Sequence, residues 1–211
     1  MNVARRFYER IRHSVCTWYG ERRLGVSTTG FIQPRELGVD NPDSKAHSAL
    51  GYEFISWALK AIPFRAEDVV FLDYGCGKGR VLAAAATWPF RKVLGVEISG
   101  QLVEVARANL ARMKHRRTAA IEVHHSDAAQ FVPPDDVNVI FFFNPFVGQT
   151  LANVVDRIER SLCTKPRDLF VIYFNHGEFD QRVQERAWLR KVHETSFCGL
   201  YRSAASIVLD G

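Results

Sequence analysis

The sequence has 211 residues, of which 47% are hydrophobic and 24% are charged, with a formal net charge of +5. This size and balance suit one globular α/β domain with a core large enough to need no disulfide or metal staples. The most apolar run, residues 137–143, is too short to span a bilayer. None of the four cysteines forms a CxxC pair, so the spacing excludes a zinc motif and suggests reduced thiols in a cytoplasmic protein (Cys16, Cys76, Cys163, Cys198).

The first 19 residues have the pattern of a basic amphipathic helix. Apolar residues recur every three or four positions between arginines, and residues 1–23 hold six arginines against two glutamates (apolar positions Val3, Phe7, Ile11, Val15, Trp18). We expect this stripe to dock on the domain, although a membrane surface or a partner remains an alternative. This basic segment, and a second basic run at 112–117, predict solubility or weak contact with nucleic acid or an anionic surface.

Residues 20–45 lack periodicity and are rich in Gly, Pro, Ser, Thr and Asp, which predicts a long loop. Such a loop is either a connector or a lid, and residues 28–31 are candidates for folding over a site. We therefore divide the chain into an N-terminal helix and lid-like loop, residues 1–46, and a main domain, residues 47–211.

From residue 47 onward, apolar runs and amphipathic segments alternate. This pattern predicts βαβ units in a mostly parallel sheet, closed by an antiparallel hairpin that turns at Cys198–Gly199. The expected helices are residues 49–61, 79–87, 101–113, 150–162 and 178–187, and the expected strands are 69–74, 93–97, 119–124, 137–143, 169–174, 189–197 and 201–209.

The first strand runs directly into three alternating glycines, Gly75, Gly77 and Gly79, with Cys76 inside the turn. Glycine permits positive φ and lets a ligand approach the backbone, and this loop lies where open α/β sheets bind ligands. A dinucleotide-binding loop has the spacing G-x-G-x-x-G, whereas Arg80 stands here where its third glycine would be.

Three acidic residues end three consecutive predicted strands: Asp73, Glu97 and Asp127. In a parallel sheet these strand ends share one edge, although each acid by itself could simply cap a turn. A carboxylate such as Glu97 can accept hydrogen bonds from both hydroxyls of a ribose. The position of Glu97 suits a nicotinamide dinucleotide as well, so it supports adenosine binding in general.

The layout Asp73-x-Gly75-x-Gly77-x-Gly79 resembles the first motif of class I methyltransferases, and the chain from about residue 20 is similar to a small bacterial family of these enzymes with mostly unassigned substrates. The resemblance implies a Rossmann-like seven-stranded mixed sheet, order 3-2-1-4-5-7-6, with helices on both faces and S-adenosylmethionine as cofactor. It also implies that Asp127 accepts from the adenine amino group, that the Ala128 amide serves a ring nitrogen and that Ile98 packs on the adenine. The alternatives are an NAD-dependent oxidoreductase and a non-catalytic nucleic-acid-binding protein of the same fold.

The fourth strand ends in Asn144-Pro145-Phe146. This triplet resembles the N-P-P-Y/F motif of amino-methylating enzymes without its second proline. The resemblance implies that the Asn144 side chain and the Pro145 carbonyl orient an amine of a protein, nucleobase or small molecule while Phe146 packs on it. A strand-ending turn is the alternative, and Asn175 or His176 could also contact the acceptor. Oligomeric state is left open, and no metal-ligand pattern is present.

Overall fold

The computed structural model describes residues 3–118, 120–184 and 186–203, and the side chains of residues 3–13 lie outside that description. Its centre is a seven-stranded sheet in the order β3-β2-β1-β4-β5-β7-β6, which confirms the predicted topology. The first five strands run parallel, and β7 is antiparallel to both of its neighbours. The strands are β1 (Val70–Tyr74), β2 (Lys92–Glu97), β3 (Ala120–His125), β4 (Val139–Phe143), β5 (Phe170–Phe174), β6 (Leu189–Glu194) and β7 (Cys198–Ser203).

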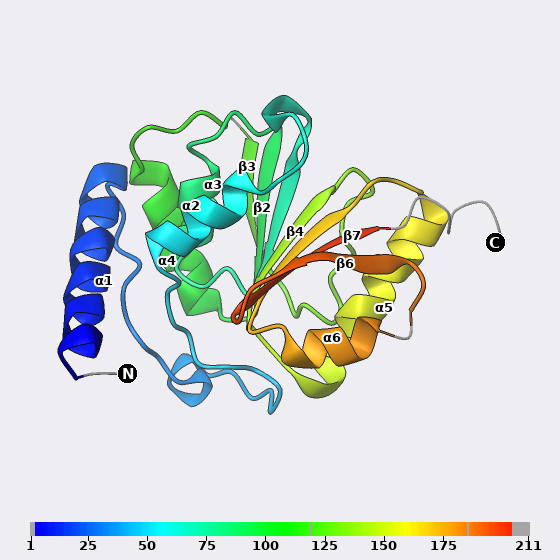
Figure 1. Ribbon diagram of the computed structural model, residues 1–211, viewed down its shortest axis with the longest axis horizontal. Helices are drawn as coiled ribbons and strands as arrows, with labels where there is room; N and C mark the ends of the chain where they lie inside the picture. The colour runs from blue at the N-terminus through cyan, green and yellow to red at the C-terminus, as the bar shows by residue number, and fades with distance from the viewer. Residues whose placement is uncertain (1–2, 119, 185, 204–211) are drawn as a thin grey trace.

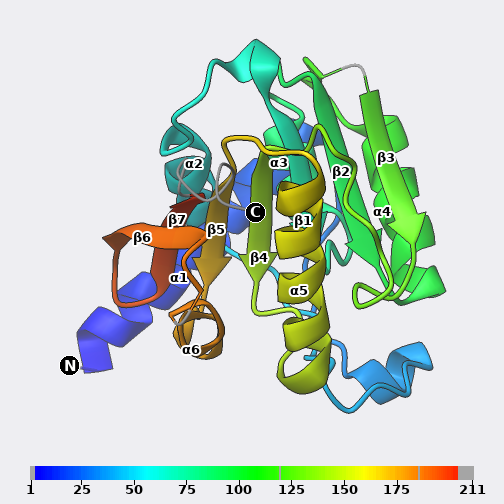
Figure 2. The same ribbon diagram turned by 90° about the vertical axis from the view of Figure 1, so that its right-hand side faces the viewer.

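Helices cover both faces of the sheet (Figures 1 and 2). Helices α2, α3 and α4 lie on one face, and α5 and α6 lie on the other. Two 3-10 turns, η1 (Pro34–Leu37) and η2 (Ala66–Asp68), flank α2 in the chain. The helices are α1 (Val3–Leu24), α2 (Tyr52–Lys60), α3 (Arg80–Ala85), α4 (Gly100–Arg112), α5 (Gly148–Thr164) and α6 (Gly177–Val183).

The central strands are apolar on both sides because both faces of the sheet are covered. In β1, Phe71 joins the core under α2, α3 and α4, while its neighbours Val70 and Leu72 join the core under α5 and α6. In β4, Phe141 and Phe142 divide between the two cores in the same way. Side chains that alternate across a strand thus explain the unbroken apolar runs in the sequence.

The closing hairpin turns earlier than we expected from the sequence. Cys198 and Gly199 lie in β7, where they pair with Phe174 and Tyr173 of β5, so the predicted turn at these residues is wrong. The chain reverses just before them, where the Thr195 hydroxyl and amide bond to Cys198. Burial of Cys198 against the core outweighs the turn preference of glycine at the next position. Residues 204–211, part of the predicted last strand, lie outside the described residues.

The N-terminal helix exists, but its apolar stripe does not dock on the domain where its side chains are described. Thr17 and Leu24 are buried against the body, whereas Val15 and Trp18 are 58% and 62% exposed. The helix contacts the domain at Gly20 instead, where its backbone lies directly against the ring of Tyr52 on α2. The docking expectation is therefore wrong for this stretch. Within residues 3–118, 120–184 and 186–203, no helix combines the length and hydropathy needed to cross a bilayer.

Candidate functional site

The glycine turn joins β1 to α3 at the carboxyl edge of the sheet. Gly75, Gly77 and Gly79 all have positive φ, at 72°, 53° and 81°. A side chain on Gly75 would collide with Pro145. The backbone of the turn therefore lies in direct contact with the residue that follows the end of β4. Gly79 packs in the same way on Ala106 of α4. The three glycines are thus required by conformation and by close packing.

Glu97, at the end of β2, holds this turn in place. One carboxylate oxygen accepts the Gly77 N–H at 2.9 Å, and the other accepts the Ser99 N–H at 3.0 Å. The side chain is 8% exposed, and burial raises its pKa although these hydrogen bonds oppose the rise. The backbone N–H of Ile98 also bonds to this carboxylate, and because a carboxylate offers about four acceptor positions, it can still accept a hydroxyl group of a ligand.

Asp73 and Cys76 are buried beneath the turn. Burial, with the nearby Glu97 charge adding to it, raises the pKa of Asp73 well above its ordinary value. Burial also raises the pKa of the Cys76 thiol, which packs against Gly95 of β2. A buried thiol with a raised pKa is a poor nucleophile, so Cys76 serves as packing.

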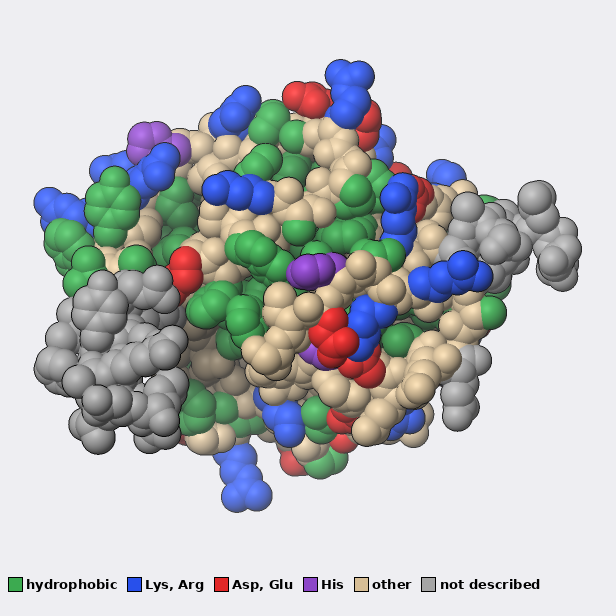
Figure 3. Space-filling view, viewed as in Figure 1, with side chains coloured by type: hydrophobic (Ala, Val, Ile, Leu, Met, Phe, Trp, Pro, Cys, Tyr) green, Lys and Arg blue, Asp and Glu red, His purple; other side chains and the backbone are tan. Residues whose placement is uncertain are grey.

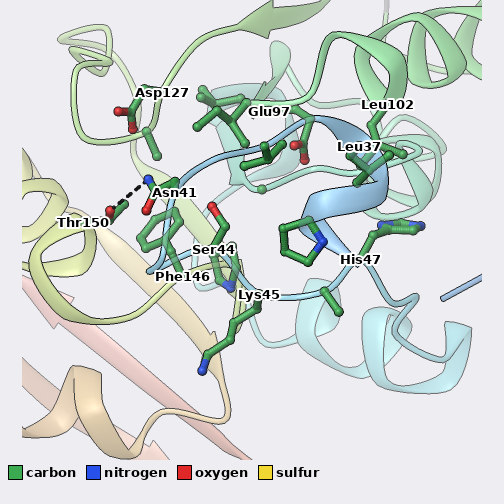
Figure 4. A pocket seen from close by; sticks show the side chains of 18 of the residues that line it. Leu37, Asn41, Ser44, Lys45, His47, Glu97, Leu102, Asp127, Phe146 and Thr150 are labelled. Carbon is green, nitrogen blue, oxygen red and sulfur yellow. Dashed lines mark hydrogen bonds between the residues drawn. The ribbon is translucent and has the colours of Figure 1, made fainter. Parts of the chain in front are cut away.

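An open pocket lies where these strands end. Figure 4 shows Glu97 and Asp127 on one side of it and Phe146 on another, with the N-terminal loop crossing over them. Eight of the twelve predicted site residues line it: Gly75, Glu97, Ile98, Asp127, Ala128, Asn144, Pro145 and Phe146. The remaining four, Asp73, Cys76, Gly77 and Gly79, lie outside its lining, in or directly beneath the turn.

Asp127 combines a turn-forming contact with a place in the pocket. One of its carboxylate oxygens accepts the Ala129 N–H at 2.8 Å, which is the capping role that the sequence left open. The next residue, Ala128, is buried beside it. Within the described residues, no group donates a hydrogen bond to the second carboxylate oxygen of Asp127. This oxygen can therefore accept a hydrogen bond from an amino group of a ligand.

Asn144 follows β4 with φ of +43°, a left-handed conformation that a non-glycine residue seldom adopts. No hydrogen bond joins its side-chain amide to another residue within the described ranges. The Pro145 carbonyl already accepts the Lys45 N–H at 3.1 Å, and Phe146 is buried and forms a bridge with Ser44. The Asn144 amide group is therefore available to a ligand, while the following two residues support the wall of the pocket.

The segment formed by residues 34–48, here called the strap, lies mostly within the loop that the sequence offered as a connector or a lid, but none of its residues was among the predicted site residues. It is tied down at Asp43, whose backbone oxygen accepts the Val147 N–H and whose carboxylate accepts the Thr150 N–H at 2.8 Å. Nine strap residues line the pocket, although loop composition alone could not have singled them out (Pro34, Leu37, Val39, Asn41, Ser44, Lys45, Ala46, His47 and Ser48). The candidate lid residues 28–31 do not line the pocket.

His47 is the titratable residue of the strap nearest to the glycine turn. Its ring covers Gly77, where an added side chain would collide with Nδ1. Burial, followed by the Lys78 charge, lowers its pKa to about 4. The imidazole is consequently neutral at pH 7 and adds no charge to the pocket.

Arg80, which broke the dinucleotide pattern, has a structural role. Its guanidinium is 5% exposed and donates to Thr28 Oγ1, to the Leu50 carbonyl and to Glu21 Oε1, at 2.7, 3.1 and 3.1 Å. Lys78 donates to the Thr29 carbonyl. Both cations therefore anchor the N-terminal segment to the glycine turn and are not directed into the pocket.

The two candidates at the end of β5 lie outside the pocket lining. Asn175 has φ of +59° and donates its N–H to the Phe197 carbonyl. The His176 ring contacts Asp180 at 2.5 Å, and Lys191 bonds to the same carboxylate at 2.8 Å. A lysine bound to the carboxylate makes this cluster a charge network, in which a metal ion would have to displace the ammonium.

Comparison with known proteins matches residues 71–165 to a family described as a methyltransferase domain. Residues 71–165 are therefore similar to a methyltransferase domain over a little less than half of the chain. The release factor glutamine methyltransferase of Koribacter versatilis is 34% identical over 88 residues, which are 41% of this chain and 30% of that protein. The chain thus matches less than a third of the length of this curated relative.

Solved structures of methyltransferases share the fold of this chain at low identity. An S-adenosylmethionine-dependent O-methyltransferase of Thermotoga maritima has a TM-score of 0.57 and 14% identity, covering 74% of this chain and 66% of its own. An RNA methyltransferase of Salinibacter ruber, in complex with S-adenosylhomocysteine, has a TM-score of 0.51 and 18% identity, covering 74% and 92%. The fold is therefore the Rossmann-like fold of S-adenosylmethionine-dependent methyltransferases, and the dinucleotide interpretation finds no support.

The pocket residues fit S-adenosylmethionine. Carboxylates from Glu97 and Asp127 face a cleft with apolar walls at Ile98 and Leu102, which suits the ribose hydroxyls, amino group and ring of an adenosine. The pocket continues along Gly75 to Asn144 and Pro145, where the remainder of the molecule would lie.

Proposed function

We propose that this protein transfers the methyl group of S-adenosylmethionine to an amine or amide nitrogen. The observation that carries the proposal is the position of Asn144: its amide group lines the same pocket as Glu97 and Asp127, at the open end of β4. The cofactor supplies an electrophilic methyl on a sulfonium. The protein must then hold the acceptor in line and keep water away.

The chemistry around Asn144 favours nitrogen over oxygen. The Asn144 carbonyl can accept an N–H and so aim the nitrogen lone pair, without adding charge. An oxygen acceptor would need a base beside it to remove its proton, and the triplet Asn144-Pro145-Phe146 offers none; the neutral imidazole of the pocket, His47, covers Gly77 of the glycine turn instead. The curated relative is named for glutamine, whose side chain carries an amide nitrogen, and this name also supports the proposal.

The strap completes the reaction chamber in this proposal. Lys45 binds the Pro145 carbonyl through its backbone, and Figure 4 shows its side chain extending away from the pocket. The strap excludes water from the cleft, and the acceptor enters beside Lys45 and Phe146. We further propose a cytoplasmic location, because all four cysteines are free.

The test begins with methyl-labelled S-adenosylmethionine and cell extract separated into protein, RNA and small-molecule fractions. The labelled product is hydrolysed and compared with N-methyl and O-methyl standards. We expect the label on nitrogen. Label on oxygen, sulfur or carbon would overturn the nitrogen assignment, and absence of label in every fraction would argue for a non-catalytic protein.

The identified product then permits a matched pair of variants. Asn144→Ala should lower turnover by about 10²-fold, since a misplaced acceptor costs this much, while leaving cofactor affinity unchanged. Asn175→Ala is the control, because Asn175 also has a positive φ at a strand end but lies outside the pocket lining. Equal losses in both variants would show that backbone strain, and not acceptor contact, explains the effect.

A further inference from the structure

The outward face of α1 joins exposed apolar and basic side chains on one surface. Eight large hydrophobic side chains are exposed within the described residues, and four of them lie on α1 or the loop that follows it: Val15, Trp18, Tyr19 and Phe31, at 58%, 62%, 61% and 67%. We call these four residues the apolar face. Trp18 and Phe31 border one surface depression, so the apolar face continues from the helix onto the loop.

Basic side chains surround the apolar face. The Arg22 guanidinium lies 5.5 Å from the centre of the Trp18 ring, and Arg23 is exposed beside it. The Lys114 N–H donates to the Leu24 carbonyl at 2.7 Å, which brings the basic run 112–117 against the end of α1. Figure 3 shows hydrophobic and basic side chains intermixed at the upper left, over the C-terminal half of α1.

The cations of this surface outnumber the two carboxylates near them, which belong to Glu21 and to Glu53. Glu53 lies on α2 and lines a hollow together with Tyr19 and Arg23. Glu21 is the acidic residue between 14 and 24, and its carboxylate is held by Arg80, Thr28 and Thr29 on the inner side of the helix. A second copy of this positively charged face would repel the first, whereas an anionic surface would attract it. A stripe that includes an aliphatic residue, Val15, gains energy from insertion among acyl chains and gains little from stacked bases.

We propose that α1 binds the surface of an anionic phospholipid bilayer, lying parallel to it. Val15 and Trp18 insert among the upper acyl chains, Tyr19 and Phe31 lie at the interface, and Arg22 with the run 112–117 contacts headgroup phosphates. In the sequence, Val3, Phe7 and Ile11 continue the spacing of Val15 and Trp18. This surface is independent of methyl transfer, and it would bring the pocket to acceptors near the membrane.

The test is sedimentation of the full chain with phosphatidylcholine vesicles, with and without a minor fraction of phosphatidylglycerol. We expect binding to the anionic vesicles alone, weakened by added salt, with a blue shift of tryptophan fluorescence that Trp18→Phe abolishes. Val15→Ser and Arg22→Gln should each weaken binding by roughly fivefold.

Two matched control variants distinguish vesicle binding by this surface from non-specific binding by exposed residues elsewhere on the protein. Val192, 56% exposed, and Arg190 both lie on β6, which Figure 1 places away from α1. Val192→Ser and Arg190→Gln should bind vesicles like the parent protein. Three results would overturn the proposal: no binding to anionic vesicles, equal losses in the control variants, or a Val15-dependent dimer or single-stranded RNA complex without vesicle binding.

Discussion

Glu97→Gln tests whether the glycine turn and the carboxylate of β2 form one nucleoside site. The carboxylate accepts the N–H groups of Gly77 and Ser99, and Glu97 lines the pocket. Glutamine keeps one of the two accepting oxygens and turns an NH₂ group toward a backbone N–H. Two effects follow, one on cofactor affinity and one on folding.

The expected loss of cofactor affinity is that of one hydrogen bond to a charged group. Such a bond contributes about 1.5–3 kcal/mol, which corresponds to a Kd for S-adenosylmethionine weaker by roughly 10- to 150-fold. The backbone N–H that loses its acceptor is buried, so the free energy of unfolding should fall by about 1–3 kcal/mol. Isothermal calorimetry measures the first effect, and urea denaturation without cofactor measures the second.

Glu122→Gln is the matched control. Glu122 lies on the neighbouring strand β3, where its half-exposed carboxylate pairs with Lys92 at 2.8 Å. This pair is exposed, so its loss should change the unfolding free energy by less than about 1 kcal/mol and leave cofactor affinity unchanged. If Glu97→Gln folds and binds S-adenosylmethionine as tightly as the parent protein, Glu97 does not contact the ribose and the site assignment is wrong.

Three more predictions concern the structure around the site. Arg80→Ala should lower the unfolding free energy by about 1–3 kcal/mol in urea titrations, because it leaves the Leu50 carbonyl without this donor and removes the cation from Glu21, whose carboxylate keeps its bonds from Thr28 and Thr29. The exposed pair of Arg91 serves as control, and a cost for Arg91→Ala equal to that of Arg80→Ala would contradict the reasoning. The pKa of Asp73 is raised in the folded protein, so the folded state binds more protons than the unfolded one above pH 3.8, and stability should decline as the pH rises through the raised pKa. Asp73→Asn should flatten that decline in denaturation midpoints from pH 4 upward, and an unchanged slope would show that Asp73 is not its source. Asp43→Ala removes the acceptor of the Thr150 N–H, so trypsin should cut the strap faster, and S-adenosylmethionine should slow that cut in the parent protein. Equal cleavage rates in the two proteins would mean that Asp43 does not hold the strap.

Sequence alone determined the sheet and the edge at which the site lies. Strands buried on both faces appear as continuous apolar runs, and an acidic residue lies within two positions of the end of each of β1, β2 and β3. In a parallel sheet, residues near the carboxyl ends of successive strands therefore lie along the same edge, so their positions in the sequence predict their positions in the fold. The order of the seven strands came from resemblance to a family, and the structure confirms it.

The position of the strap, the role of Arg80 and the orientation of α1 could be learned only from the tertiary structure, because each depends on contacts between residues far apart in the sequence. Asp43 meets Thr150 and Arg80 meets Glu21 across more than fifty positions, so no local pattern placed the strap over the pocket or Arg80 beneath the N-terminal segment. Periodicity showed that α1 has an apolar stripe but not which side faces the domain. Close packing of Gly20 on Tyr52 turned that stripe outward, because shape at the contact outweighed the apolar area available on the other face.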